Sequence, residues 1–308
     1  MPMKLAANIL EELWFDEPGE DDENAKAAAS MAAKLGEING LKPFPVVAQK
    51  VLAKLNQPDF RVVEVTSILE DDPSLAAGVL RVANSAFFAG AKNVSSITQA
   101  FMRMGGMSVK ESVLSVAMMD MFPDTGGLGK RIRDHCAATA AIVQSLTRDF
   151  ASRHIEGIFL IGLMHDVGKL LLMESEELIY DTSDLNATLS PDRIHLDERA
   201  LLGYDHAVLA GHVLTTWKIP EPIPRVVAWH HQPTRAYQDP ELGIMVAMLR
   251  IADQLDIMFS TDQDMTAFVS EFSKGPDCTF AGLSEESLMG VLDALYHARG
   301  DALAMFGG

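Results

Sequence analysis

The sequence predicts an all-α protein, and three observations lead to that prediction. Alanine and leucine are abundant, whereas aromatic residues make up only 7% of the 308 residues, a balance that favours helices over sheets. Apolar residues recur at helical spacing, as at Val47, Val51 and Leu55, and no segment alternates apolar and polar residues as a half-buried strand does. We therefore expect a multi-helix bundle made of two helical subdomains.

Changes of composition along the chain divide it into four parts. Eight acidic residues and no basic one lie between Glu11 and Glu23, and a Pro/Gly-rich connector runs from Pro123 to Gly129. The expected parts are an acidic N-terminal extension (1–40), an N-terminal helical subdomain (41–125), a second helical subdomain (126–260) and a C-terminal helical extension (261–308).

Local signals also place helix ends in the first subdomain. Asp72 is suited to cap a helix, and Pro73 fits its first position, where a missing N–H costs nothing. The pair Gly105-Gly106 is expected to turn the chain, and Ser108 with Glu111 three residues later predicts a capping box for the next helix.

The composition also limits the functions to consider. The fractions of 48% hydrophobic and 22% charged residues are typical of a soluble globular protein, and no apolar run reaches the length of a membrane span. The N-terminus does not resemble a secretory signal, so we expect a cytoplasmic protein. The net charge of −18 argues against binding to nucleic acid or to an anionic membrane. Cys136 and Cys278 form no paired motif, which fits a reducing compartment.

His165 and Asp166 are neighbours inside an apolar run from Ile155 to Met173 that predicts a largely buried helix. A buried ionisable pair is costly unless it is hydrogen-bonded or holds a cation. One interpretation is a core histidine beside a helix-end carboxylate. The other is two metal ligands from one helix, with Lys169 close enough to contact a bound anion. Lys169 could equally be a helix-end lysine that interacts with the helix dipole.

Further candidate ligands lie on separate predicted helices. A single histidine on an apolar face is more often a packed core residue, but several such residues can converge at one point in a helical bundle. Imidazole with carboxylate suits Fe, Mn, Zn or Ni better than Mg or Ca. One or two such ions would draw on His135, His165, Asp166, His206, His230, His231 and Asp253.

The order His135, His165-Asp166, Asp253 resembles the ligand pattern H…HD…D of the HD superfamily of metal-dependent phosphohydrolases. The chain from Leu41 to Ile257 is more similar still to one branch, the HDOD domain (HD-related output domain) of bacterial signalling proteins. The resemblance rests on Arg81–Phe88 (Arg-Val-Ala-Asn-Ser-Ala-Phe-Phe), Val94-Ser95-Ser96-Ile97 with Met104-Gly105, Gly203–Ala207, Trp217–Pro220 and Trp229–His231. Within the first phrase, Arg81 and Asn84 are expected either to bridge backbone groups between the two subdomains or to face a ligand or partner.

The resemblance has two implications that differ. HDOD domains are mainly regulatory modules that often lack the ancestral ligands, yet this chain has a candidate at every ligand position. His206 and the His230-His231 pair match additional histidines of the two-metal cyclic-dinucleotide phosphodiesterases called HD-GYP. Gln232 stands where those enzymes have a glutamate, and the Gly-Tyr-Pro phrase is absent, which argues against that activity.

Two hypotheses follow from the resemblance. In the first, the protein is a bacterial regulatory HDOD protein that retains an HD-type metal site, acts through a protein partner and receives its input from another chain. In the alternative, it is an active metal-dependent phosphohydrolase, a phosphodiesterase or a phosphatase, acting on a nucleotide-like phosphoester. Asp166 would then bridge two ions or orient the attacking water, and Lys169 would neutralise a phosphate.

Overall fold

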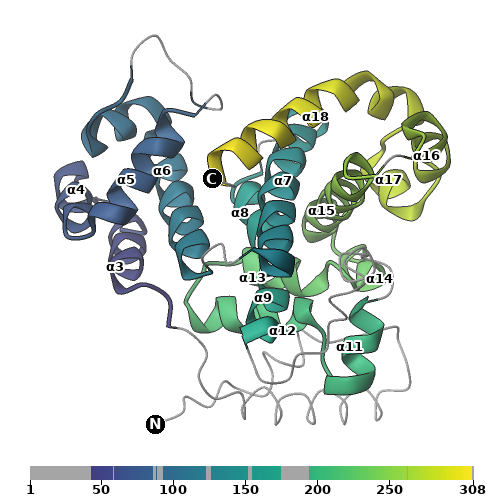
Figure 1. Cartoon of the computed structure of the whole chain (residues 1–308), viewed down its shortest axis with the longest axis horizontal. Helices are drawn as coiled ribbons and strands as arrows, with labels where there is room; N and C mark the ends of the chain where they lie inside the picture. Colours follow the sequence, from purple (N-terminus) through teal and green to yellow (C-terminus); the bar gives the residue numbers. More distant parts are fainter. Residues whose placement is uncertain are drawn as a thin grey trace. The chain divides into compact units, whose positions relative to one another are not determined.

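The computed structural model describes residues 43–306 except 58, 86–87, 89–92, 123–125, 152–154, 175–193 and 262 (Figure 1). Every regular element in these residues is a helix, which confirms the all-α prediction. The predicted acidic extension, residues 1–40, lies outside the described part. Among the described helices, none combines the length and the apolar character that crossing a membrane requires.

The chain divides into two compact units, and each is described by itself. One comprises the described residues between 43 and 122 together with 300–306, and the other comprises the described residues between 126 and 299. The helices of the first unit are α3 (Val46–Leu55), α4 (Val62–Glu70), α5 (Pro73–Ala83) and α6 (Ile97–Met121).

In this unit the predicted helix cap at Asp72 is present, whereas the predicted helix cap at Ser108 is not. The Asp72 carboxylate accepts from the backbone N–H of Leu75 at 3.1 Å, so it caps α5 as expected. Gly105 has φ 78° and ψ 165°, which kinks α6; glycine adopts this conformation without a steric penalty. The helix resumes directly after Gly105, so Ser108 lies inside it and is not the predicted cap.

Asn84 bridges backbone groups within the first unit. Its amide nitrogen donates to the carbonyls of Leu80 (2.9 Å) and Val94 (2.8 Å), and its amide oxygen accepts from the N–H of Val94 (2.7 Å). This residue therefore joins the end of α5 to the segment that precedes α6.

The second unit contains the predicted metal ligands. Its helices are α7 (Gly127–Phe150), α8 (Ile158–Met164), α9 (Val167–Glu174), α11 (Ile194–Leu202), α12 (His206–Thr216), α13 (Ile223–Trp229), α14 (Pro233–Ala236), α15 (Pro240–Phe259), α16 (Met265–Phe272), α17 (Pro276–Ala281) and, as far as residue 299, α18 (Glu285–Phe306). The long helix α7 packs against α8 and α15, while α12 packs against α9 and α13 (Figure 1).

Two glycines allow the helices around the site to approach closely. A Cβ atom on Gly162 would lie 2.6 Å from the Cα of Ala140 in α7, and one on Gly168 would lie 1.9 Å from the carbonyl oxygen of His206. No side chain fits in either place. The absence of a Cβ therefore sets how near α8 comes to α7 and how near α9 comes to α12.

Candidate metal centre

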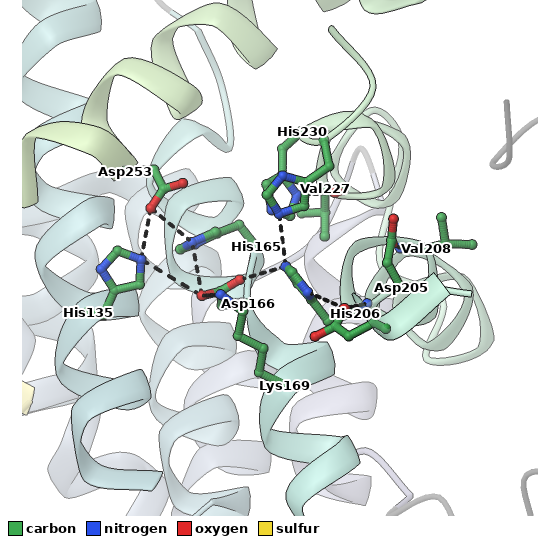
Figure 2. A network of polar contacts seen from close by, with 12 residues as sticks. His135, His165, Asp166, Lys169, Asp205, His206, Val208, Val227, His230 and Asp253 are labelled. Carbon is green, nitrogen blue, oxygen red and sulfur yellow. Dashed lines mark hydrogen bonds and ion pairs between the residues drawn. The ribbon is translucent and has the colours of Figure 1, made fainter. Parts of the chain in front are cut away.

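Seven predicted ligands from different elements lie together in the core of the second unit. Figure 2 shows six of them, all except His231. None of their side chains belongs to the exposed surface, since each residue is 6% exposed or less. They are His135 of α7, His165 and Asp166 between α8 and α9, His206 at the start of α12, His230 and His231 directly after α13, and Asp253 of α15.

The predicted single helix through His165 and Asp166 is two helices. The α8 helix ends before His165, and α9 begins after Asp166. The imidazole Nδ1 of His165 donates to the carbonyl oxygen of Gly162 at 2.7 Å. In an uninterrupted helix that oxygen would accept from the backbone N–H of Asp166. The break therefore places His165 and Asp166 at a junction between two helices.

Two groups of ligand atoms form within this cluster, and in each group the atoms lie within 4.8 Å of one another. One group is His135, His165 and Asp166, and the other is His206, His230 and His231. Asp166 reaches both, because its Oδ2 lies 3.5 Å from Nε2 of His165 and its Oδ1 lies 3.1 Å from Nε2 of His206.

Asp253 completes the first group. Its Oδ1 lies 3.0 Å from Nε2 of His135 and 4.0 Å from Nε2 of His165 (Figure 2). Two carboxylates and two imidazoles thus face a common point.

Four of the histidines are oriented by an acceptor on the far side of the ring. A hydrogen bond from Nδ1 leaves the Nε2 lone pair free to bind a cation. The Nδ1 contacts are His135 to Asp256 (2.7 Å), His165 to the carbonyl of Gly162 (2.7 Å), His206 to Glu198 (2.6 Å) and His230 to the carbonyl of Val227 (2.6 Å).

Several of the facing atoms are buried without a hydrogen bond. These atoms are Nε2 of His165 and Nε2 of His230, and Nδ1 of His231 also has no hydrogen-bond partner. Burying an unpaired polar group costs about 1–3 kcal/mol, and a divalent ion coordinated by these lone pairs would remove that cost. The arrangement therefore fits a metal ion, and its mixture of nitrogen and oxygen donors suits a transition metal.

Lys169 does not lie at the C-terminal end of a helix, where a lysine would interact favourably with the helix dipole. It is in the first turn of α9 and only 2% exposed, and its Nζ lies 2.7 Å from Oδ2 of Asp166. Burial lowers the pKa of Lys169, but the carboxylate of Asp166 outweighs it, and the net shift is upward. Lys169 is therefore a buried cation at the candidate metal centre.

The histidines of the site fall into two sets that differ in the direction of their pKa shifts. Burial disfavours the charged form of His135, but the carboxylates of Asp253 and Asp256 outweigh it and raise the pKa to about 10. Burial likewise opposes protonation of His206, and mainly the Glu198 carboxylate raises its pKa to about 9.

The other three histidines shift in the opposite direction. Burial lowers the pKa of His165 below its usual value, and it lowers those of His230 and His231 further, since neighbouring imidazoles also oppose a positive charge there. These rings are neutral near neutral pH, which is the form that binds metals.

Several residues at the site were not identified from the sequence. Glu198 and Asp256 orient His206 and His135, and the ring of His195 stacks on that of His231 at 4.3 Å and 5°. One signal was available: Asp256 follows a candidate ligand, Asp253, by three residues inside an apolar helix, so both lie on one face.

Known proteins resemble this chain at low identity. An uncharacterized protein of Treponema pallidum is 21% identical over 213 residues, and these cover 68% of this chain but only 40% of that protein. The chain therefore spans less than half the length of this relative.

Solved structures share the fold. An HDOD domain protein of unknown function from Geobacter sulfurreducens has a TM-score of 0.69 at 20% identity, covering 91% of this chain and 96% of that one. A Shewanella amazonensis protein provisionally named a phosphohydrolase has a TM-score of 0.70 at 24% identity, covering 91% and 97%. A second Shewanella amazonensis protein, provisionally named a metal-dependent phosphohydrolase, has a TM-score of 0.63 at 21% identity, covering 92% and 99%.

The family model of the HDOD domain matches residues 41–233, which is more than half of the chain. This match includes every candidate ligand except Asp253, which lies twenty residues beyond its end. With this match and the helical fold of its described residues, this chain belongs to the HDOD family.

Proposed function

We propose that this protein is a bacterial signal-transduction protein that holds a divalent transition metal in its HD-type centre and acts through a protein partner. One observation carries the proposal: buried imidazoles and carboxylates from five parts of the fold converge in the core, and ring nitrogens of His165, His230 and His231 among them have no hydrogen bond. Such an arrangement is costly unless a cation compensates it.

The residues divide between two ion positions. Asp166 would contribute one carboxylate oxygen to each, since its two oxygens face different groups. The first position would use His135, His165, Asp166 and Asp253, and the second would use His206, His230, His231 and Asp166. Fe, Mn, Zn and Ni are the metals whose preferences match these donors.

Three features favour regulation over catalysis. Access to the ligands is limited, because none is more than 6% exposed. Lys169, the residue that could neutralise a phosphate, already pairs with Asp166 at 2.7 Å. In addition, Gln232, at the position where HD-GYP enzymes have a glutamate, is buried and donates to the carbonyl of Ala228 at 3.4 Å.

Hydrolysis of a phosphoester is the second candidate, and the complete ligand set supports it. A bound divalent ion lowers the pKa of a water and polarises a phosphoryl oxygen. Asp166 would orient the attacking water through Oδ1, and Lys169 would have to leave Asp166 to meet the phosphate. A nucleotide or similar phosphoester is the substrate class expected.

The partner in signalling is proposed to be another protein. The net charge of −18 opposes binding to the phosphate backbone of nucleic acids. A metal ion held at this centre, or a nucleotide, is nevertheless proposed as the signal.

Elemental analysis of the purified protein tests the metal centre. We expect bound metal in the wild type and a loss of most of it in His165→Ala and Asp253→Ala. His297→Ala is the matched control, because His297 is an exposed histidine in the same unit, its side chain 74% exposed. Metal-free wild-type protein after growth with Fe, Mn, Zn and Ni would refute the proposal.

Assays of the metal-loaded protein with phosphatase and phosphodiesterase substrates, with Mn or Fe added, separate the two candidates. Turnover that disappears in Asp166→Asn would establish the phosphohydrolase. Metal binding without turnover of any substrate would leave the regulatory function.

A further inference from the structure

We infer that Arg299 of the C-terminal helix α18, acting through Asp256, is a positioning residue that holds His135 ready to bind metal. The inference deepens the proposed function and rests on it, since His135 is a ligand of the proposed centre. Arg299 lies 66 residues beyond the end of the HDOD match at residue 233 (299 − 233).

A chain of short contacts connects α18 to the centre. Nδ1 of His135 lies 2.7 Å from Oδ2 of Asp256, and the other oxygen of that carboxylate, Oδ1, accepts from Nε of Arg299 at 2.6 Å. The same guanidinium donates through Nη2 to the hydroxyl of Ser260 at 2.7 Å. Three helices, α7, α15 and α18, are thereby joined through four side chains.

Asp256 supports the ligand and does not itself face the metal position. It contacts Nδ1 of His135, whereas Asp253 faces Nε2 on the opposite side of the ring. Both oxygens of Asp256 are already used, one by His135 and one by Arg299. A carboxylate in this place fixes the ring orientation and makes Nε2 a better donor to a metal.

Arg299 compensates the negative charge of the buried Asp256 carboxylate. Asp256 is only 3% exposed, and a buried carboxylate is costly unless a cation and hydrogen bonds compensate it. The planar guanidinium is rigid and donates in fixed directions, so its two contacts determine where the carboxylate lies. The side chain of Arg299 is 19% exposed, so the chain of contacts from the buried centre ends at a partly exposed residue.

A purely mechanical role is the competing explanation. In that case Arg299 would only tie α18 to α15, and its loss would lower stability without changing His135. The two explanations differ in metal affinity and in the state of the Nδ1 proton of His135, and stability alone does not distinguish them.

Titration of metal-free protein with Zn²⁺ and with Mn²⁺ tests the inference. We expect Arg299→Gln to weaken binding about 10-fold and Asp256→Asn about 10- to 100-fold. Arg299→Lys should bind metal more tightly than Arg299→Gln but less tightly than the wild type, since lysine restores the positive charge without the planar guanidinium. The control is Arg148→Gln, whose arginine pairs with Asp149 at 3.0 Å on the surface of the same unit; it should bind as the wild type does.

A second measurement needs no metal. In proton NMR of the metal-free protein, the hydrogen-bonded Nδ1 proton of His135 should give a downfield resonance, assigned by its absence in His135→Gln. We expect it to broaden or vanish in Arg299→Gln and to persist in Arg148→Gln.

The possible results distinguish a failure of this inference from a failure of the proposed metal-binding function. Wild-type protein that binds neither ion would remove the proposed function, and the Nδ1 resonance would still decide whether Arg299 positions His135. Wild-type affinity and an unchanged resonance in Arg299→Gln would overturn the inference and leave the metal centre intact. Lower stability alone, with both readouts unchanged, would also overturn it.

Discussion

At the scale of single residues, Lys169 is a cation that the protein itself supplies to the site. Its Nζ lies 2.7 Å from Asp166, and both side chains are 2% exposed or less. An uncompensated charge at this depth would be strongly unfavourable. We interpret Lys169 as the group that lets the acidic side of the centre remain buried when no metal is bound.

The replacement Lys169→Met tests this interpretation. It leaves Asp166 buried without its ammonium partner, so we expect the metal-free protein to lose about 3–5 kcal/mol of stability. Denaturant unfolding with and without Mn²⁺ measures the effect, which should be smaller with metal because the ion also compensates Asp166.

Lys274→Met is the control for this experiment. Lys274 pairs with Glu271 at 3.0 Å with its side chain 65% exposed, and such a change should alter stability by about 0.5 kcal/mol or less. Equal losses in Lys169→Met with and without metal would contradict the interpretation.

At the scale of helices, the site depends on how closely α9 and α12 approach. Gly168 of α9 meets the backbone of His206 at the start of α12, and a Cβ there would come within 1.9 Å of the His206 carbonyl oxygen. The same approach brings Asp166 to 3.1 Å from the ring of His206. A glycine therefore keeps the two groups of ligands adjacent.

We expect Gly168→Ala to separate α9 from α12 and to impair metal binding as well as stability. Because the clash is with backbone, relief requires a shift of a whole helix, and overpacking of this kind costs about 1–3 kcal/mol or more. Thermal unfolding and metal content of the purified variant measure the two effects.

Gly290→Ala is the comparison for this variant. Gly290 lies in α18, and a Cβ atom added there would meet no atom within 4 Å apart from its chain neighbours and the backbone of its own helix, so alanine should be neutral or stabilising by up to about 1 kcal/mol. Normal metal content in Gly168→Ala would show that the close approach is not required.

At the scale of the whole molecule, the opposing histidine pKa shifts predict a stability maximum for the metal-free protein. His135 and His206, with pKa values raised to about 10 and about 9, keep protons that the unfolded chain releases above about pH 6.5. Their contribution is complete below about pH 6.5 and is lost as the pH rises through 9 and 10.

The histidines with lowered pKa values act in the other direction. His165, His230 and His231 stay neutral when folded, whereas unfolding lets them take up protons below about pH 6.5. Stability therefore falls as the pH drops below that value. Unfolding temperatures of chelator-treated protein should peak near pH 6.5 and decline on both sides.

Bound metal should reduce the loss of stability that the metal-free protein shows above about pH 6.5. Because metal binding requires deprotonated Nε2 atoms, the affinity rises with pH. At a metal concentration of about 100 times Kd, the stabilisation is about 2.7 kcal/mol. A metal-loaded protein that loses stability above about pH 6.5 as steeply as the metal-free one would contradict the prediction.

Much of this protein could be predicted from its sequence because the relevant signals are local. Helical spacing of apolar residues and caps such as Asp72 act within one or two turns, so they indicate the helices without any knowledge of their packing. The HDOD phrases likewise lie in short segments. His165-Asp166 was identifiable as unusual, since an ionisable pair in an apolar run is costly wherever the helix packs.

The tertiary structure alone decided what those residues do together. The break between α8 and α9, the pairing of Lys169 with Asp166, and the support of His135 by Asp256 and Arg299 all depend on how the helices pack. Arg299 contacts Asp256 across 43 residues, and no periodicity in either segment indicates it. Local sequence sets the faces of helices, whereas the distance between charged groups, which governs their energy, is set only when the helices pack.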